Sequence, residues 1–256
     1  MSTGLGNAVE IIESSSGRPM EAPQDGSLSA SFLAFIAEDH FPCVGAKAAL
    51  SQGAVRTAEF GTLGDADNDQ GLLEALTDFT VMLDAGAYPE STVHSFAALF
   101  KAPFGTGELR FEHLLWHQLW RLHRLDMERG MAQAQDVSND TGSDRFSLSI
   151  AGHPYFIIGL HPGASRIARC FRHPTLVFNS HRQFEQLRAD GRYQKLQEAI
   201  RGRDRALQGS INPNLADFGA ASEARQYSGR AVEDHWKCPY DFSSANSSLL
   251  GACPRA

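Results

Sequence analysis

Residues 146–179 read FSLSIAGHPYFIIGLHPGASRIARCFRHPTLVFN and indicate the fold class of the chain. Apolar and polar residues alternate from Phe146 to Leu160 around Gly152-His153-Pro154, which is typical of a β-hairpin. A Pro and a Gly then stop the second strand, and we expect a basic helix to begin at once. His161 is thereby left at a strand end, where its side chain either faces a cofactor or substrate or merely caps the local backbone. The strand end, the turn and the helix N-terminus together form a candidate anion or cofactor site.

Helical spacing is frequent on both sides of this hairpin. Before it, apolar residues recur at helical intervals in the stretches 29–38, 44–53, 72–85, 91–100 and 111–130. After it, residues 175–178 form a short apolar strand, and Ser180 with Gln183 gives the capping-box pattern of a helix start. That helix ends at Gly191, and another is expected over 193–207. We therefore expect a mostly helical single domain of the α+β class around a small mid-chain β-sheet.

Length and composition place the chain among ordinary globular proteins. It has 256 residues, of which 42% are apolar and 21% charged, and 16 Phe and 3 Trp are available to fill a core. Residues 1–28 and 243–256 are rich in small and polar residues, so we expect them to be mobile tails. One domain is then expected over residues 29–242.

Charge, hydropathy and cysteine usage exclude several classes of partner. A net charge of −7 argues against binding nucleic acid, which needs a basic surface. No apolar stretch is long enough for a membrane span, and the N-terminus does not have the pattern of a secretory signal. The four cysteines are scattered and form no C-x-x-C pair, so neither a structural zinc site nor a disulfide scaffold is expected. The expected location is the cytoplasm, with free thiols.

Two cysteines are candidate functional residues. Cys43 stands where a predicted helix begins, and the free N–H groups and dipole there favour the thiolate. A thiolate is what a nucleophile or a haem iron ligand needs. Cys238 follows Lys237, whose charge also favours the thiolate. The alternative for each is a small buried apolar side chain.

Three histidines lie in the segment 112–126, EHLLWHQLWRLHRLD. His113 and His117 are four residues apart and share a helix face, so they could bind one metal ion together. His123 follows on the same helix. The alternative is a solvated polar face opposite the leucines.

The polar block 209–230, GSINPNLADFGAASEARQYSGR, is long for a loop inside a compact domain, and such loops are usually functional or disordered. Its carboxylates Asp217 and Glu223 could hold a guanidinium or an ammonium group. Its arginines could equally bind a carboxylate. The alternative is an ordinary surface loop with salt bridges.

Several of these segments, in this order along the chain, resemble the YqcI/YcgG family. The resemblance covers roughly residues 30–240 and excludes both tails. The matching segments are FPCVGAK at 41–47, LLWHQLWRLHRLD at 114–126, FIIGLHPGASRIAR at 156–169, LVFNSHRQFEQLR at 176–188, the block 209–230, and WKCPY at 236–240.

This resemblance implies an enzyme of specialised metabolism. Better understood members are haem-dependent N-oxygenases that act on an amino or guanidino nitrogen, with L-arginine as the leading substrate. The implied cofactor is haem (heme, iron protoporphyrin IX) and the co-substrate is O₂. Because the chain has no nicotinamide or flavin motif, the two electrons of a monooxygenation must come from an external donor, a ferredoxin or a reductase.

Residue chemistry suggests candidates for the axial ligand of such a haem. A thiolate ligand favours O–O cleavage, so Cys43 at the predicted helix N-terminus is the first choice. His161 is the second choice as ligand, and otherwise lies on the distal side. Cys238 is the third choice.

The remaining site candidates are charged. Arg166 and Arg169, in the predicted basic helix, could pair with the haem propionates. Asp217 and Glu223 are the candidates for binding a small cationic amino-acid-like substrate.

Two other functions remain open at this stage. One is a non-haem iron oxygenase whose metal is bound by His113, His117 or His123 with a carboxylate. The other is a non-catalytic protein that binds haem or another small ligand, such as a sensor or carrier. The sequence leaves open whether the protein forms a homodimer.

Overall fold

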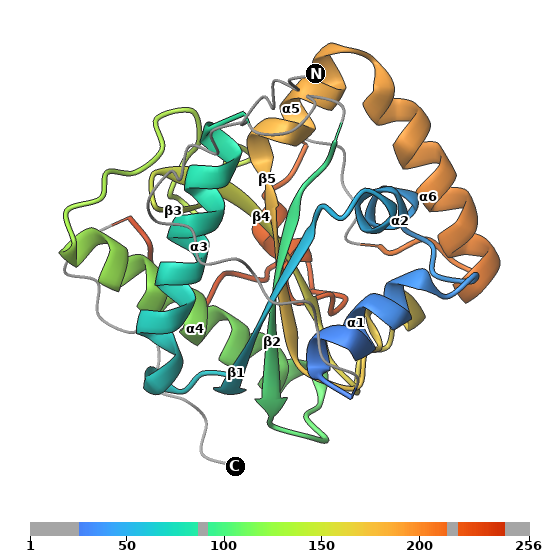
Figure 1. Ribbon diagram of the computed structural model, residues 1–256, viewed down its shortest axis with the longest axis horizontal. Coiled ribbons are helices and arrows are strands. Elements are labelled where there is room, and N and C mark those ends of the chain that lie inside the picture. Colours follow the sequence, from blue (N-terminus) through green and yellow to red (C-terminus); the bar gives the residue numbers. More distant parts are fainter. Residues whose placement is uncertain (1–25, 87–91, 214–219, 244–256) are drawn as a thin grey trace, which may run out of the picture.

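A mixed five-stranded β-sheet forms the centre of the protein (Figure 1). The computed structural model describes residues 26–86, 92–213 and 220–243. The strand order is β1-β2-β5-β4-β3; β1 and β2 are parallel and every other neighbouring pair is antiparallel. The strands are β1 Val55–Thr62, β2 Ser95–Ala102, β3 Leu148–Ile150, β4 His153–Leu160 and β5 Thr175–Ser180. Helices surround this sheet, which confirms the predicted α+β class.

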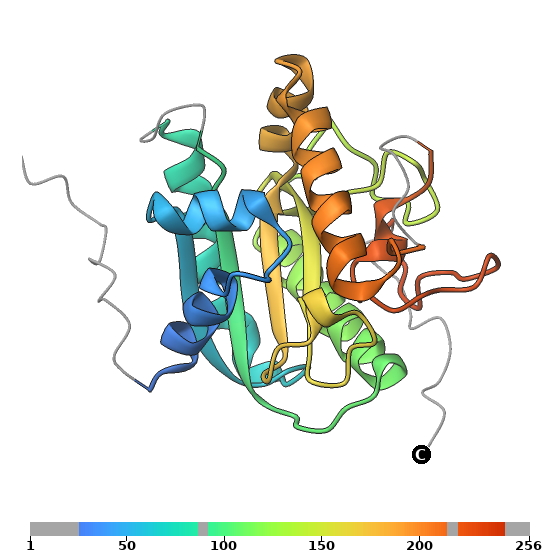
Figure 2. The same ribbon diagram turned by 90° about the vertical axis from the view of Figure 1, so that its right-hand side faces the viewer.

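Helices cover both faces of the sheet (Figure 2). Helix α3, Asp69–Asp84, connects the parallel strands β1 and β2, and packs with α4, Glu108–Glu128, on one face. The other face is covered by α1 Leu28–Ala37, α2 Val44–Ser51, α5 His181–Ala189 and α6 Arg192–Gln208. Three short 3₁₀ turns complete the described elements: η1 Ala66–Asn68, η2 Ile167–Arg169 and η3 Glu223–Gln226.

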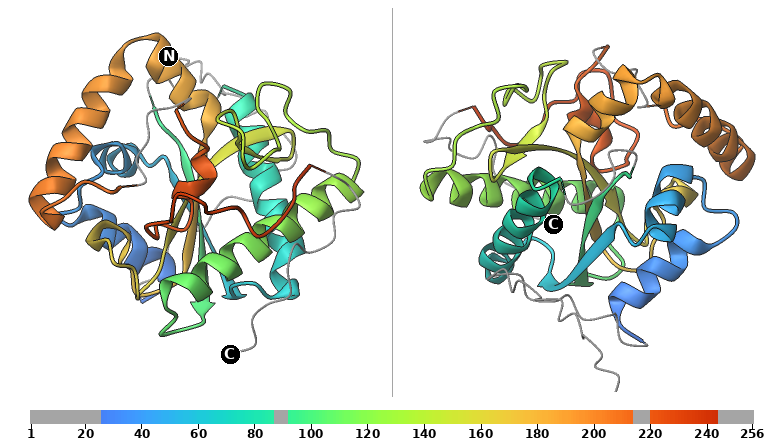
Figure 3. Two further views of the ribbon diagram at one scale, coloured as in Figure 1. Left: turned by 180° about the vertical axis from the view of Figure 1, so that it is seen from behind. Right: turned by 45° about the horizontal axis from the view of Figure 1, so that its top comes forward.

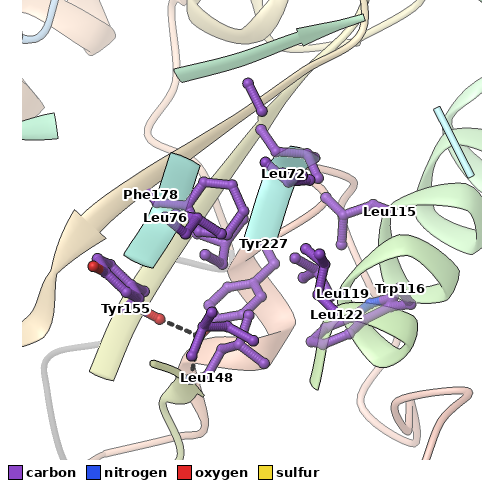
Figure 4. Close-up of a cluster of buried hydrophobic side chains, with 14 of the residues drawn as sticks. Leu72, Leu76, Leu115, Trp116, Leu119, Leu122, Leu148, Tyr155, Phe178 and Tyr227 are labelled. Carbon is purple, nitrogen blue, oxygen red and sulfur yellow. Dashed lines mark hydrogen bonds between the residues drawn. The ribbon is translucent and has the colours of Figure 1, made fainter. Parts of the chain in front are cut away.

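The sheet separates two clusters of buried side chains. Successive side chains of a strand point to opposite faces. Along β4, Tyr155 and Ile157 belong to the cluster with α3 and α4, whereas Leu160 belongs to the cluster with α1. In the larger cluster, Tyr227 lies between the sheet and α4, and its ring stacks on Trp116 with centroids 5.2 Å apart (Figure 4).

The C-terminal segment 220–243 runs along α4 with little regular structure (Figure 3, left). It is held by aromatic side chains: the rings of Trp236 and Phe242 lie 6.2 and 5.9 Å from Trp116 of α4. Burial of such large rings stabilises the segment without a helix or a strand.

Two of the predicted elements are wrong. Residues 91–100, predicted to be helical, contribute the strand β2, and strand β1 was not predicted at all. Residues 95–100 of β2 are buried on both faces of the sheet, so their sequence has no period-2 alternation and resembles a buried helix. The predicted basic helix after Gly163 is only the three-residue turn η2. Leu160 at the end of β4 pairs with Thr175 at the start of β5. Residues 161–174 therefore form a loop that leaves and rejoins the sheet at the same end.

The hairpin and the helix caps follow their local signals. The hairpin turn is Ala151-Gly152, where both residues have positive φ angles of 53° and 70°, as a tight two-residue turn requires. Ser180 caps α5 by accepting a hydrogen bond from the Gln183 backbone N–H at 3.4 Å. The Gln183 side chain accepts instead from His94 N–H at 2.8 Å, so only half of the predicted capping box forms.

The predicted tails, 1–28 and 243–256, fall almost entirely outside the described residues. Within the described part of the chain, every helix is too short or too polar to cross a membrane.

Candidate functional site

A cavity of about 320 Å³ lies between the sheet and the helices α1, α2, α5 and α6. The strands contribute Phe156, Ile158 and Val177, and Phe156 also packs against the larger core with its ring 5.7 Å from that of Tyr227. The rest of its apolar wall comes from the helices and from the loop before α2, with Phe32, Ile36, Phe41, Phe184, Leu196 and Ile200. A cavity with mostly apolar walls and a few polar groups is typical of a cofactor or small-molecule site.

Cys43 lies on the wall of this cavity. It is the N-cap residue of α2, and its Sγ accepts a hydrogen bond from the Ala46 backbone N–H at 3.4 Å. Burial raises the pKa of the Cys43 thiol, although the backbone N–H groups of Ala46 and Gly45 and the charge of Arg169 act in the opposite direction. The expected acidic thiol is therefore wrong for the free protein. Coordination of a metal displaces a thiol proton, so this does not prevent Cys43 from acting as a ligand.

Arg169 also faces the cavity, and within the described residues its guanidinium is hydrogen-bonded to backbone oxygens alone. It donates to the carbonyls of Gly159 at 3.0 Å, Gln226 at 3.3 Å and Tyr227 at 3.5 Å. Burial lowers the pKa of Arg169 to about 10. No carboxylate of the described residues forms an ion pair with this guanidinium, so its charge is available to an anionic group in the cavity.

Arg166 lines the same cavity, but its guanidinium is already occupied. It forms a buried salt bridge with Asp204 of α6 and donates to Ser210 Oγ at 3.0 Å. Of the two predicted propionate partners, Arg169 is therefore the one whose charge has no carboxylate partner in the described structure.

Glu223 lies at another part of the cavity wall, on η3. Glu223 is only 7% exposed. Tyr227 donates a hydrogen bond to Glu223 Oε1 at 2.7 Å, and His181 Nδ1 lies 3.7 Å from Oε2. Within the described ranges, no Lys or Arg pairs with Glu223, so a cationic ligand could do so.

His161 lies on the other face of the sheet. Phe156, Ile158 and Leu160 face the cavity, so the next residue points the opposite way. His161 is 1% exposed and stacks on Phe111 of α4 with ring centroids 4.2 Å apart. Burial lowers its pKa, and its Nδ1 has no hydrogen-bond partner in the described structure. The structure therefore does not bring His161 together with Cys43.

Cys238 is also remote from the cavity, because it belongs to the larger core beside α4. Burial raises the pKa of its thiol to about 12, which opposes the predicted effect of Lys237. Asp217 lies outside the described residues.

The three histidines of α4 do not converge on a metal site. His113 and His117 pack on the ring of Tyr240, with centroids 6.0 and 5.9 Å away, whereas His123 packs on Phe242 at 5.4 Å. The described ranges contain no group of three His, Cys, Asp or Glu side chains placed to hold one ion.

The sequence reasoning missed His181 and the cavity wall from α6. His181 is the first residue of α5 and lies next to Glu223, which is distant in sequence. The sequence signal that could have identified His181 is its position directly after the helix cap Ser180. The sequence predicts α6 as a helix but does not indicate that Tyr193, Leu196 and Ile200 line the cavity.

The donor set of the cavity fits a haem. A thiol stands at the start of a helix, apolar and aromatic side chains form most of the walls, and Arg169 offers a charge that no carboxylate of the described residues neutralises. These are the groups that an axial ligand, a porphyrin ring and a propionate require.

Comparison with known proteins adds a family but no characterised relative. No curated protein and no solved structure matches the chain. The model of the YqcI/YcgG family matches residues 32–241, which include the whole sheet and every residue of the cavity wall named above. The chain therefore belongs to the YqcI/YcgG family.

Proposed function

We propose that the protein is a haem-dependent monooxygenase that hydroxylates an amino or guanidino nitrogen of a small amino-acid-like substrate. The observation that carries this proposal is the Cys43 thiol on the wall of an apolar cavity that also exposes Arg169 and Glu223. An apolar cavity with a thiol, a cation and a carboxylate can bind a cofactor and a polar substrate side by side.

Cys43 holds the iron in this proposal. The helix N-terminus stabilises its thiolate once the proton has been displaced, and Arg169 binds a propionate. When bound, haem supplies the activation of O₂, and a thiolate ligand favours O–O cleavage. The apolar side chains exclude water from the cavity, which strengthens both ionic contacts.

Glu223 binds the cationic nitrogen of the substrate. Its carboxylate is buried and is oriented by Tyr227, so a positively charged group can form a charge-assisted hydrogen bond with it. L-arginine is the leading substrate by family resemblance. An external ferredoxin or reductase supplies the two electrons. The described cysteines are all free, which fits the reducing cytoplasm in which we place the protein.

Absorption spectra of protein expressed with a haem supply test this proposal. We expect a haem spectrum and, for the ferrous-CO form, the strong red shift of a thiolate ligand. Cys43→Ser should lose that shift. Cys170→Ser is the matched control, because Cys170 is exposed and lies outside the apolar cavity, and it should keep the shift.

Three outcomes would overturn parts of the proposal. A colourless protein that haemin cannot reconstitute removes the cofactor. An unchanged spectrum of Cys43→Ser removes the ligand. A haem protein that yields no hydroxylated product from L-arginine or other cationic amino acids, with a competent reductase present, is a sensor or carrier.

A further inference from the structure

His181 stands between two carboxylates, one inside the cavity and one at the surface. Its Nδ1 lies 3.7 Å from Glu223 Oε2, and its Nε2 lies 3.5 Å from Glu185 Oε1. The His181 residue is 5% exposed, whereas the side chain of Glu185 is 47% exposed. The imidazole therefore lies within salt-bridge distance of a buried carboxylate and of a carboxylate in contact with water.

The buried end of this link is held in a defined orientation. The Tyr227 hydroxyl donates to Glu223 Oε1 at 2.7 Å. Burial and the neighbouring Glu223 raise the pKa of Tyr227 well above its ordinary value, so the phenol stays protonated as a donor. Oε2 of Glu223 is the oxygen that lies near His181, at 3.7 Å from Nδ1.

Other charges near His181 are already paired. Arg182, the next residue, donates to Asp136 at 3.0 Å, and this carboxylate also acts electrostatically on His181. Arg188 forms a salt bridge with Glu185 and faces the cavity from the same helix. Glu185, Glu223 and Asp136 are thus the carboxylates that act on the imidazole within the described structure.

The reaction proposed above requires removal of a proton. A protonated amine has no lone pair, and a guanidinium has delocalised its lone pairs, so a nitrogen must lose a proton before an oxygen atom can bond to it. A carboxylate alone is a weak base for such groups, whereas histidine titrates near neutral pH. A base in contact with the nitrogen-binding carboxylate meets this need.

We propose that His181 removes this proton through Glu223 and releases it to water through Glu185; this inference rests on the proposed function. The N–H bond of the substrate breaks and its electron pair stays on nitrogen. The proton passes across Glu223 to the imidazole, which becomes an imidazolium flanked by two carboxylates. The Nε2–H bond of the imidazolium then breaks, Glu185 takes this proton and passes it to water, and the ring is left neutral with the transferred proton on Nδ1. No electrons are transferred in these steps. Contacts of this length often shorten when substrate binds.

The pH dependence of turnover tests this role in the haem-loaded enzyme. For the wild type, we expect kcat/KM to fall at low pH, because a relay that already carries a proton cannot accept another. His181→Asn should lower kcat by about 100-fold and remove that acid limb, because proton transfer by a positioned side chain contributes this much. Glu198→Gln, an exposed change on α6, is the matched control and should leave the profile unchanged.

A second measurement uses the haem-free protein and no turnover. In long-range ¹H–¹⁵N spectra of the histidine rings, Glu223→Gln should shift the Nδ1 signal of His181, and Glu185→Gln should shift the Nε2 signal. Glu198→Gln should shift neither. Unchanged His181 signals in both variants would overturn the inferred contacts.

The two proposals fail in different ways. If the wild type binds no haem or forms no product, the proposed function is wrong. If the wild type forms product and His181→Asn keeps both its rate and its acid limb, the inference about His181 is wrong and the proposed function stands.

Discussion

The ring of His161 stacks on the ring of Phe111 at 4.2 Å, on the face of the sheet opposite Cys43. His161 therefore acts in the packing of α4 against the sheet. His161→Phe preserves an aromatic stack, so we expect wild-type haem binding and stability. His161→Ala leaves a void and should lower the free energy of unfolding by about 2–3 kcal/mol. Urea denaturation and the ferrous-CO spectrum check both variants. Loss of the haem spectrum in a folded His161→Phe protein would contradict this assignment.

Gly159 allows α4 to approach the sheet closely. A Cβ at this position would lie 2.7 Å from Phe111, 2.8 Å from Leu115 and 2.8 Å from the Tyr227 carbonyl oxygen. Gly159→Ala should therefore lower the free energy of unfolding by about 1–3 kcal/mol.

Gly202 offers the matched control for Gly159. It lies inside α6, where a Cβ would meet nothing within 4 Å. Gly202→Ala should raise the free energy of unfolding by about 0.5–1 kcal/mol, since alanine favours a helix. Urea denaturation of the two variants should give changes of opposite sign, and equal changes would contradict the packing described here.

His153 makes the stability of the protein depend on pH. It is 3% exposed and lies 2.8 Å from Ser180 Oγ, and burial lowers its pKa to about 4. The unfolded chain takes up a proton near pH 6.5, whereas the folded protein does so only near pH 4. Stability should therefore be lost as the pH falls from about 6.5 to about 4, by roughly 3 kcal/mol from this residue.

Unfolding measured between pH 4 and pH 7 checks the effect of His153. His153→Gln should show a shallower loss of stability over this range than the wild type. An equal slope in both proteins would assign the effect to other groups, such as the buried His123 and His161, whose pKa values are also lowered by burial.

The buried pair Arg166–Asp204 fastens the loop after β4 to α6. Arg166→Ala leaves the Asp204 charge buried without its partner and should lower the free energy of unfolding by about 3–5 kcal/mol. The double variant Arg166→Met with Asp204→Leu removes both charges and should recover most of that loss. A double variant as unstable as Arg166→Ala would contradict this account, as judged by thermal and urea denaturation.

Local signals predicted the parts of the fold that depend on local structure. The hairpin around Gly152, the Ser180 cap and the leucine repeat of α4 each follow from residues a few positions apart. β2 could not be predicted in this way, because its residues 95–100 are buried on both faces and have no alternation.

The candidate site depends on relations that local patterns do not contain. Cys43, Arg169 and Glu223 were all found by their chemistry, but their shared cavity forms only when α2, η2 and η3 assemble around the sheet. His161 was also chosen by its chemistry, but it stacks on Phe111 and does not line the cavity, because successive positions along a strand point to opposite faces. The role proposed for His181 depends on its contact with Glu223, which is 42 positions away in the chain.

The alternation of side chains along β4 gives successive residues of one strand two different roles. Tyr155, Ile157 and Gly159 belong to the packing with α3 and α4, whereas Phe156, Ile158 and Leu160 shape the cavity. Substitutions at the second set can reshape the ligand space while the scaffold is maintained. An insertion or deletion of a single residue in this strand exchanges the two sets and damages both at once. Divergence within such a strand therefore proceeds by replacement and not by a change of length.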